Sequence, residues 1–220
     1  MPAIEFVDVH GGRDRTPVLR GVSFAVYRGA VAALVGPGGA GKSSCLRQIV
    51  GLETPWAGDV IVEGRSVPSL KRRRLAELRE RFGVMFQAGP AADCALFAAM
   101  DVYTNVAVPI RVAGSAREPE IRRRTLERLE EVGLREYANA MPAELTAPLR
   151  KRAALARALA ARPEFALLDD LDEELDDLCD VIRERRESDR GTYLLTTRDA
   201  DLAARVADEV FHLVEGRLVA

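Results

Sequence analysis

The sequence contains only three cysteines among its 220 residues, Cys45, Cys94 and Cys179, and no two of them form a CxxC motif. An odd number of widely spaced cysteines predicts neither a disulfide framework nor a zinc site. Long apolar runs are also missing, since runs such as Val31–Val35 fall far short of the roughly 20 residues of a membrane span. The N-terminus has no basic segment followed by an apolar stretch, so we expect no signal peptide, no direct membrane span and a cytoplasmic chain.

The chain also lacks a large excess of charge of either sign. The formal net charge is −2 and the isoelectric point is near 5.9, which excludes a strongly basic nucleic-acid binder. Lysine is rarer still, because only three of the 32 basic residues are lysines and the other 29 are arginines. A lysine kept in such a chain points to a place where a compact ammonium group is needed, and Lys42 is the candidate.

Short apolar runs alternate with helical patterns along the chain. This alternation predicts an α/β sheet with a helical block near the middle. The expected strands are 3–9, 22–27, 31–35, 59–62, 83–86, 165–168, 192–196 and 209–214, and the expected helices are 41–50, 71–81, 118–131, 149–161, 173–187 and 199–207. A glycine-rich turn is expected at residues 11–15.

A glycine-rich segment links the strand 31–35 to the helix 41–50. It matches the motif G-x-x-x-x-G-K-[ST], in the order Gly36, Pro37, Gly38, Gly39, Ala40, Gly41, Lys42 and Ser43. The glycines let backbone N–H groups turn toward phosphates, and the helix N-terminus adds positive potential. The motif predicts that Lys42 binds the β- and γ-phosphates, that Ser43 binds Mg²⁺, and that Ser44 belongs to the same phosphate site.

A second motif supplies the carboxylate that such a site needs to hold Mg²⁺. The apolar run Phe165–Leu168 predicts a buried strand, and Asp169 follows directly at its end. Paired with the glycine-rich loop, Asp169 is the expected magnesium ligand.

The order of these motifs resembles the ATP-binding subunit of ABC transporters over essentially the whole chain. VMFQ ends in Gln87 at the family's Q-loop position, and the segment MPAELTAPLRKRAALARALA stands in the signature position. ALLDD then corresponds to Walker B, LDEELD to the D-loop, and TTRD places Arg198 at the switch-histidine position. The segments LFAAM, VYTNV and MPAEL further resemble the Mce/Mla branch, which powers lipid transport across bacterial envelopes.

The resemblance implies one domain of residues 1–220 with a P-loop NTPase fold. Its RecA-like α/β core would comprise residues 1–87 and 150–220, with an N-terminal antiparallel β subdomain and a helical insertion at 88–149. The implied cofactors are ATP and Mg²⁺, and Gln87 would contact both the ion and the attacking water.

The implied partners are a second ATPase subunit and a membrane permease, with no nucleic acid. The ATPase pair would be a head-to-tail homodimer or heterodimer, in which each ATP lies between the P-loop of one subunit and the signature of the other. The loop at Gln87 would face the permease, which places the chain on the inner face of the cell membrane.

Three departures from the family pattern concern catalysis. The signature, usually LSGGQ or LSGGM, is here Leu145–Leu149, in which Pro148 has no N–H to donate. Asp170 stands at the position of the catalytic glutamate and is one methylene shorter. Arg198 keeps a donor but cannot cycle a proton as histidine does. Asp170, Gln87 and Arg198 are therefore the implied catalytic residues, and we expect weak hydrolysis.

The segment Asp169–Asp177 carries seven carboxylates in nine residues. We interpret it as a solvated acidic turn rather than an EF-hand, because no glycine stands at the required sixth position.

Two hypotheses follow. In the first, the chain hydrolyses ATP to drive lipid transport. In the second, it is a degenerate ABC-type module that binds Mg-ATP, turns over little and acts as a regulatory or structural subunit. A P-loop kinase is a weaker third alternative, since the sequence shows no lid or acceptor motif.

Overall fold

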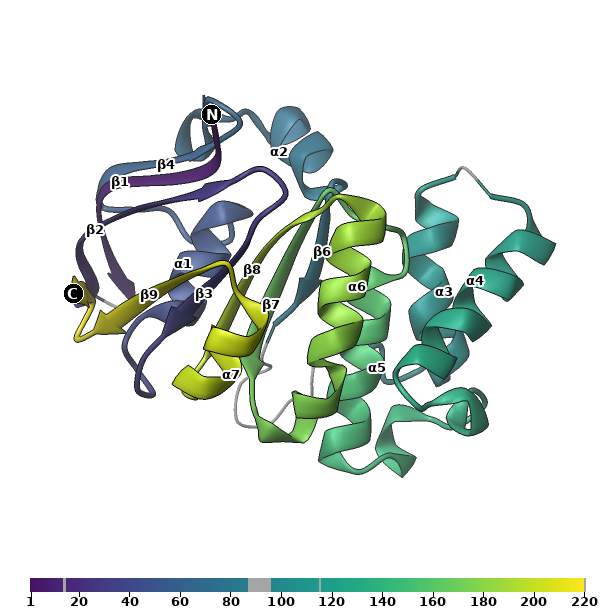
Figure 1. Ribbon diagram of the computed structural model, residues 1–220. Coiled ribbons are helices and arrows are strands. Elements are labelled where there is room, and N and C mark those ends of the chain that lie inside the picture. The colour runs from purple at the N-terminus through teal and green to yellow at the C-terminus, as the bar shows by residue number, and fades with distance from the viewer. Residues whose placement is uncertain (14, 87–95, 115, 220) are drawn as a thin grey trace.

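The computed structural model describes residues 1–13, 15–86, 96–114 and 116–219. Figure 1 shows two sheets flanked by helices. The strands are β1 (Pro2–Arg13), β2 (Thr16–Tyr27), β3 (Val31–Val35), β4 (Ala57–Val62), β5 (Arg65–Ser66), β6 (Phe82–Met85), β7 (Phe165–Leu171), β8 (Thr192–Thr197), β9 (Glu209–Val214) and β10 (Arg217–Val219). The α-helices are α1 (Lys42–Ile49), α2 (Arg72–Arg79), α3 (Val102–Val112), α4 (Glu118–Glu131), α5 (Ala147–Leu159), α6 (Cys179–Asp189) and α7 (Ala200–Val206), and the 3-10 helices are η1 (Val67–Ser69), η2 (Arg135–Tyr137), η3 (Pro142–Glu144) and η4 (Glu173–Leu178).

The six-stranded sheet has the order β10-β9-β3-β8-β7-β6. Its pairs from β9 to β6 are parallel, and β10 runs antiparallel to β9. All five residues of β3 are buried, as expected for a strand that is covered on both faces. Because the strands are parallel, β3, β7 and β8 end at the same edge of the sheet, which is the lower edge in Figure 1. This edge carries the candidate site.

A separate antiparallel sheet, in the order β2-β1-β4-β5, forms the N-terminal part of the fold. Helix α1 lies between the two sheets (Figure 1), and its Leu46 and Ile49 are fully buried in the apolar cluster that both sheets share. Phe24 stacks on Phe6 at 4.5 Å between ring centroids and contacts Phe211 of β9 at 5.1 Å. The packing of these rings therefore fixes the antiparallel sheet against the parallel one.

Helices α5, α6 and α7 cover the other face of the parallel sheet, and α3 and α4 pack outside α5 (Figure 1). A helical block between β6 and β7 is what the sequence predicts, and α4 has the predicted bounds. The division into a core and an insertion at residues 87/88 and 149/150 stays a prediction.

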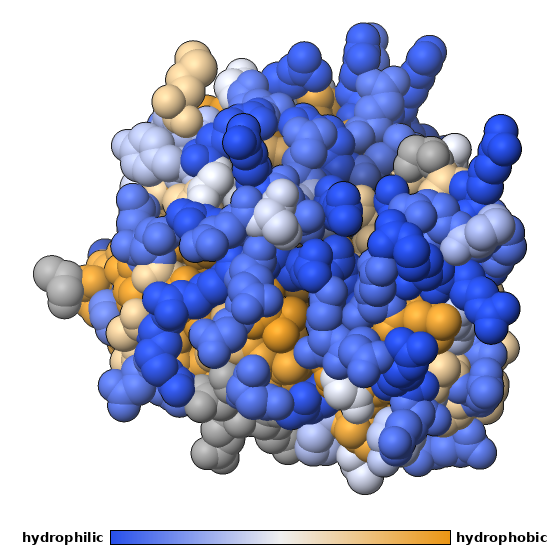
Figure 2. All heavy atoms as spheres, turned by 45° about the vertical axis from the view of Figure 1, so that its right-hand side comes forward, coloured by the Kyte–Doolittle hydropathy of each residue, from blue (hydrophilic) through white to orange (hydrophobic). Residues whose placement is uncertain are grey.

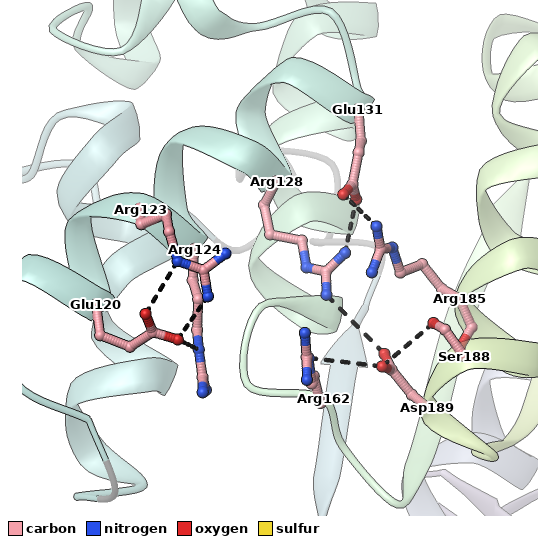
Figure 3. Close-up of polar contacts among 9 residues, drawn as sticks. All are labelled: Glu120, Arg123, Arg124, Arg128, Glu131, Arg162, Arg185, Ser188 and Asp189. Atoms are coloured by element: carbon pink, nitrogen blue, oxygen red, sulfur yellow. Dashed lines mark hydrogen bonds and ion pairs between the residues drawn. The ribbon is translucent and has the colours of Figure 1, made fainter.

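A buried ion network fastens α4 to α6 (Figure 3). Arg128 of α4 is 6% exposed, and its Nη1 lies 2.6 Å from Glu131 Oε2 while its Nη2 lies 4.0 Å from Asp189 Oδ2. Arg185 of α6 also pairs with Glu131, and Arg162 Nε approaches Asp189 at 3.6 Å. Buried charges are tolerated when such partners surround them. These ion pairs therefore hold α4 and α6 in their relative positions.

The structure differs from the sequence prediction at several element ends. The turn expected at residues 11–15 is shorter, because Gly11 and Gly12 pair with Leu19 and Pro17 and continue β1. Cross-strand pairing here outweighs the local preference of glycine for turns. The helix expected at 173–187 is divided into η4 and α6, and the short edge strands β5 and β10 carry too little pattern for prediction.

None of the described helices is both long and apolar enough to cross a membrane. Figure 2 shows one face of the molecule, on which hydrophilic side chains dominate and smaller apolar patches lie between them.

Candidate nucleotide-binding site

The glycine-rich loop connects the end of β3 to the start of α1. Gly39 and Gly41 have φ angles of 79° and 105°, a region that residues with a Cβ rarely adopt. A Cβ on Gly36 would lie 2.0 Å from the carbonyl oxygen of Leu213, whereas a Cβ on Gly39 would meet no atom of the described residues within 4 Å. The loop therefore needs glycine for its shape, and at Gly39 its backbone faces open space where a phosphate can approach.

Lys42 is the first residue of α1 and its side chain folds back over this loop. Its Nζ donates hydrogen bonds to the carbonyl oxygens of Gly36 at 2.6 Å and Pro37 at 3.0 Å. Burial lowers the pKa of Lys42 below its ordinary value of 10.5, and the nearby Arg198 lowers it further, while Asp170 and Asp169 oppose the shift. The ammonium group is thus held where it can exchange carbonyl acceptors for phosphate oxygens.

Asp169 joins the loop to the neighbouring strands. Its Oδ1 accepts hydrogen bonds from Ser43 Oγ at 2.9 Å and from Thr196 Oγ1 at 2.7 Å, and the residue is only 1% exposed. Thr196 also accepts a hydrogen bond from the backbone N–H of Asp170 at 2.8 Å. A hydroxyl and a carboxylate are oxygen ligands of the kind that Mg²⁺ prefers, so Ser43 and Asp169 fit the predicted ion.

Asp170 and Arg198 face each other across the mouth of the site. Asp170 has a positive φ of 58°, and its Oδ1 lies 3.9 Å from Arg198 Nε. The Cζ atom of Arg198 is 3.9 Å from the position of a Cβ on Gly38. The guanidinium group therefore stands between the Asp170 carboxylate and the glycine-rich loop, where it can donate to a phosphate oxygen.

Two adjoining hollows meet at this pair. The first, of about 260 Å³, is lined by Val18, Gly38, Gly39, Ala40, Gly41, Lys42, Ser43, Ser44, Arg47, Asp169, Asp170, Thr196 and Arg198. The second, of about 370 Å³, is lined by Asp170, Leu171, Asp172, Thr197, Arg198 and Asp199. The first hollow joins the glycine-rich loop to Ser43 and Asp169, the predicted magnesium ligands, and the second is rich in carboxylates.

Most of the predicted site residues come together here. Residues 38–44, Asp169, Asp170 and Arg198 line the first hollow, while Gly36 and Pro37 hold Lys42. Gln87 lies outside the described residues. Sequence reasoning missed Thr196; the available signal was only that two consecutive threonines, Thr196 and Thr197, follow an apolar run. The catalytic roles of these side chains stay predictions.

The signature segment Leu145–Leu149 does not line the first hollow. It lies at the start of α5, where Pro148 is the second helical residue and the Thr146 side chain makes no capping hydrogen bond. Proline is tolerated at this position because an N–H in the first turn of a helix has no hydrogen-bond acceptor within the helix. The substitution is therefore compatible with the fold and removes a donor from the end of the helix.

The family described as ABC transporter matches residues 19–172. The methionine import ATP-binding protein MetN of Caulobacter vibrioides is 39% identical over 208 residues, which cover 92% of this chain and 61% of that protein. MetN of Rhizobium etli is 35% identical over 221 residues, covering 98% of this chain and 60% of that protein. The chain thus spans about three fifths of the length of these relatives.

A solved structure of an ATP-binding cassette has the same fold as this chain. A dimeric ATP-binding cassette in a post-hydrolysis state, bound to ADP and Pi, matches with a TM-score of 0.87 and 26% identity, covering 99% of this chain and 97% of that one. The predicted P-loop NTPase fold and the prediction of ATP and Mg²⁺ as cofactors are confirmed. Because the family match covers more than half of the chain, the protein belongs to the ABC transporter family.

Proposed function

We propose that this chain is the ATP-binding subunit of a membrane transporter, that it binds Mg-ATP at the first hollow, and that it hydrolyses ATP slowly. The observation that carries the proposal is the 2.9 Å hydrogen bond between Ser43 and Asp169 beside the buried Lys42. A phosphate-binding lysine, a hydroxyl and a strand-end carboxylate are thereby assembled from segments more than 120 residues apart.

The proposed partners are a second ATP-binding subunit and a permease. A head-to-tail pair is supported by the separation between the P-loop and the signature, since Leu145–Leu149 lies away from the first hollow of its own chain. Each composite site would take its phosphate loop, Asp170 and Arg198 from one subunit and its signature from the other.

Slow turnover is supported by three features of that composite site. The Asp170 carboxylate is one methylene shorter than glutamate, and a displacement of the order of 1 Å can cost about 100-fold in rate. Arg198 cannot accept a proton from water. Pro148 removes an N–H donor from the signature. In a homodimer every site carries all three features, and in a heterodimer with an intact partner each site carries at least one.

Steady-state phosphate release by the purified chain, together with ATP titration calorimetry, tests this function. We expect clear ATP binding and a turnover far below the typical enzyme rate of about 10 per second. Turnover at that rate refutes the degenerate mechanism, and the absence of ATP binding refutes the function as a whole.

The permease-docking surface is proposed at the loop that precedes α3. Asn105 is fully buried and holds this loop, because its side chain accepts the N–H of Phe97 and donates to the carbonyl oxygens of Phe97 and Met100. Phe97 and Met100 remain 48% and 38% exposed on this rigid support. Leu96 and Tyr103, the other large apolar residues of this stretch, pack against the apolar core and are not part of the proposed surface.

This docking proposal is tested by placing charge on the exposed apolar pair. Phe97→Glu with Met100→Glu should abolish co-purification with the membrane subunit and leave ATP binding unchanged. Val219→Glu, at an exposed apolar residue of β10, is the matched control. Survival of the complex in the double variant would place the docking site elsewhere.

The transported substrate is a separate question. The relatives described above are methionine importers by name, which favours methionine import over the lipid transport that the Mce/Mla resemblance implies. We therefore propose methionine as the first substrate to test. Uptake of labelled methionine should be restored by this chain in a bacterium that lacks its own methionine-import ATP-binding subunit, and failure with a matched permease present would return lipid transport to first place.

A further inference from the structure

The end of β7 departs from the regular alternation of a strand. Leu167 packs in the apolar cluster that contains α1, and Leu168 packs in the cluster beneath α5, α6 and α7. Because successive side chains of a strand point to opposite faces, Asp169 should then face α1, and Asp170 should face away from it, under the helices. The structure instead places both aspartates along the first hollow.

A β-bulge accounts for this arrangement. Strands β7 and β8 lie side by side and parallel (Figure 1), and their register shifts between Leu168 and Leu171. Asp169 and Asp170 together lie opposite one residue of β8, Thr196. The extra residue in β7 lets Asp170 face the hollow and returns Leu171 to the apolar cluster beneath the helices.

The bulge includes a backbone conformation that needs support. Asp170 has a φ angle of 58°, in the left-handed region that residues with a Cβ rarely adopt. Such a conformation persists only where the surrounding contacts fix it. The neighbouring strand β8 supplies contacts of this kind.

The hydroxyl group of Thr196 contacts both residues of the bulge. It donates a hydrogen bond to Asp169 Oδ1 at 2.7 Å and accepts the backbone N–H of Asp170 at 2.8 Å. Thr196 is fully buried, so water cannot readily replace these two bonds if the hydroxyl is removed. One hydroxyl thereby orients the side chain of the predicted magnesium ligand and the backbone of the carboxylate that follows it.

We propose that Thr196 is a positioning residue of the nucleotide site, whose hydroxyl holds the bulge that turns two consecutive carboxylates toward the phosphates. The inference rests on the proposed binding and hydrolysis of Mg-ATP. Asp169 keeps its Oδ1 at 2.9 Å from Ser43 Oγ, which pairs two oxygen ligands for Mg²⁺. Asp170 keeps its carboxylate beside Arg198 at the mouth of the site. Groups that orient a metal ligand in this way typically contribute about 10- to 100-fold to metal affinity or to rate.

Thr196→Val tests the proposal, because valine has nearly the shape of threonine but no hydroxyl. ATP affinity is measured by titration calorimetry in Mg²⁺ and in EDTA, and kcat by phosphate release at saturating Mg-ATP. We expect Thr196→Val to bind ATP about 10-fold more weakly in Mg²⁺ and equally well in EDTA, with kcat lowered by about 10- to 100-fold. Thr196→Ser keeps the hydroxyl and should bring both quantities back close to the wild type.

Thr192→Val is the matched control at the opposite end of β8. Thr192 is also buried, and its hydroxyl accepts the N–H of Gly29 at 2.9 Å, so this variant likewise removes a hydrogen bond from the same strand. The control should keep the ATP affinity and the kcat of the wild type, and thermal denaturation measures the loss of stability in both variants. If Thr196→Val does not fold, Thr196→Ala gives the same comparison with Thr196→Ser.

The inference is overturned if Thr196→Val matches the wild type in Mg²⁺, if its ATP affinity falls equally in Mg²⁺ and EDTA, or if Thr192→Val loses as much. Each of these outcomes leaves the proposed function standing as long as the wild-type chain binds Mg-ATP. A wild-type chain that binds no ATP refutes instead the proposed function on which this inference rests.

Discussion

Replacement of Lys42 by alanine tests the nucleotide site most directly. In the free protein the ammonium group already donates to two carbonyl oxygens, at 2.6 and 3.0 Å. Binding ATP exchanges these neutral acceptors for charged phosphate oxygens, so the gain is the difference between the two sets of bonds. Hydrogen bonds to charged partners contribute about 1.5–3 kcal/mol, which corresponds to a loss of roughly 10- to 100-fold in ATP affinity for Lys42→Ala.

Titration calorimetry with Mg-ATP measures this loss, and Lys71→Ala is the matched control because Lys71 is exposed ahead of α2. We expect the control to bind ATP as the wild type does. Equal affinities of Lys42→Ala and Lys71→Ala would show that the lysine does not hold the phosphates and would refute the assignment of the site.

The pH dependence provides a second readout of the same group. Burial lowers the pKa of free Lys42, whereas bound phosphate favours the charged ammonium and raises its pKa again. ATP affinity should therefore be constant well below the lowered pKa and fall as the pH rises through it, with proton uptake on binding in alkaline buffer. Lys42→Ala should lose this proton uptake, and an unchanged uptake would assign it to another group.

Three further predictions concern the ion, the chemistry and the stability. Ser43→Ala should weaken ATP binding in Mg²⁺ but not in EDTA, as measured by parallel titrations, and an equal loss in both buffers would contradict the role of Ser43 as an ion ligand. Asp170→Glu alone should raise phosphate release little, because groups that act as one unit are non-additive. The rate should rise by about 100-fold or more when Asp170→Glu is combined with Arg198→His, Thr146→Ser, Ala147→Gly and Pro148→Gly. A full gain from Asp170→Glu alone would contradict this account. Arg128→Met should lower the free energy of unfolding by about 1–3 kcal/mol in urea denaturation, since Glu131 and the buried Asp189 then keep Arg185 and Arg162 as their cations in the described part of the chain. Arg123→Met on the exposed side of α4 should cost far less, and equal losses would show that the α4–α6 network contributes little.

Local sequence was enough for the elements whose patterns are strong. The apolar run at 31–35, the run at 209–214 and the helix at 118–131 have the predicted bounds. In each of them the burial of a strand or of one helix face follows from the order of apolar residues. The division at 173–189 was not predicted, because the charged composition there suits a continuous exposed helix equally well.

The sequence by itself determined the phosphate loop, because its shape depends on consecutive residues. Glycines at 39 and 41 permit positive φ angles, and Lys42 follows at the start of a helix. Asp169 was predictable for the same reason, as a carboxylate directly after an apolar strand. These motifs carry their geometry in a few neighbouring residues.

Only the tertiary structure decided the contacts between distant segments. The bond from Thr196 to Asp169, the approach of Arg198 to Asp170 and the network between α4 and α6 all require that particular strands and helices become neighbours. Strand order is set by the packing of the whole sheet, and a single sequence does not show which strands will lie side by side. The position of the acidic segment Asp169–Asp177 beside α5 follows from the same packing, because Lys151 donates to Asp172 and Arg152 pairs with Asp177.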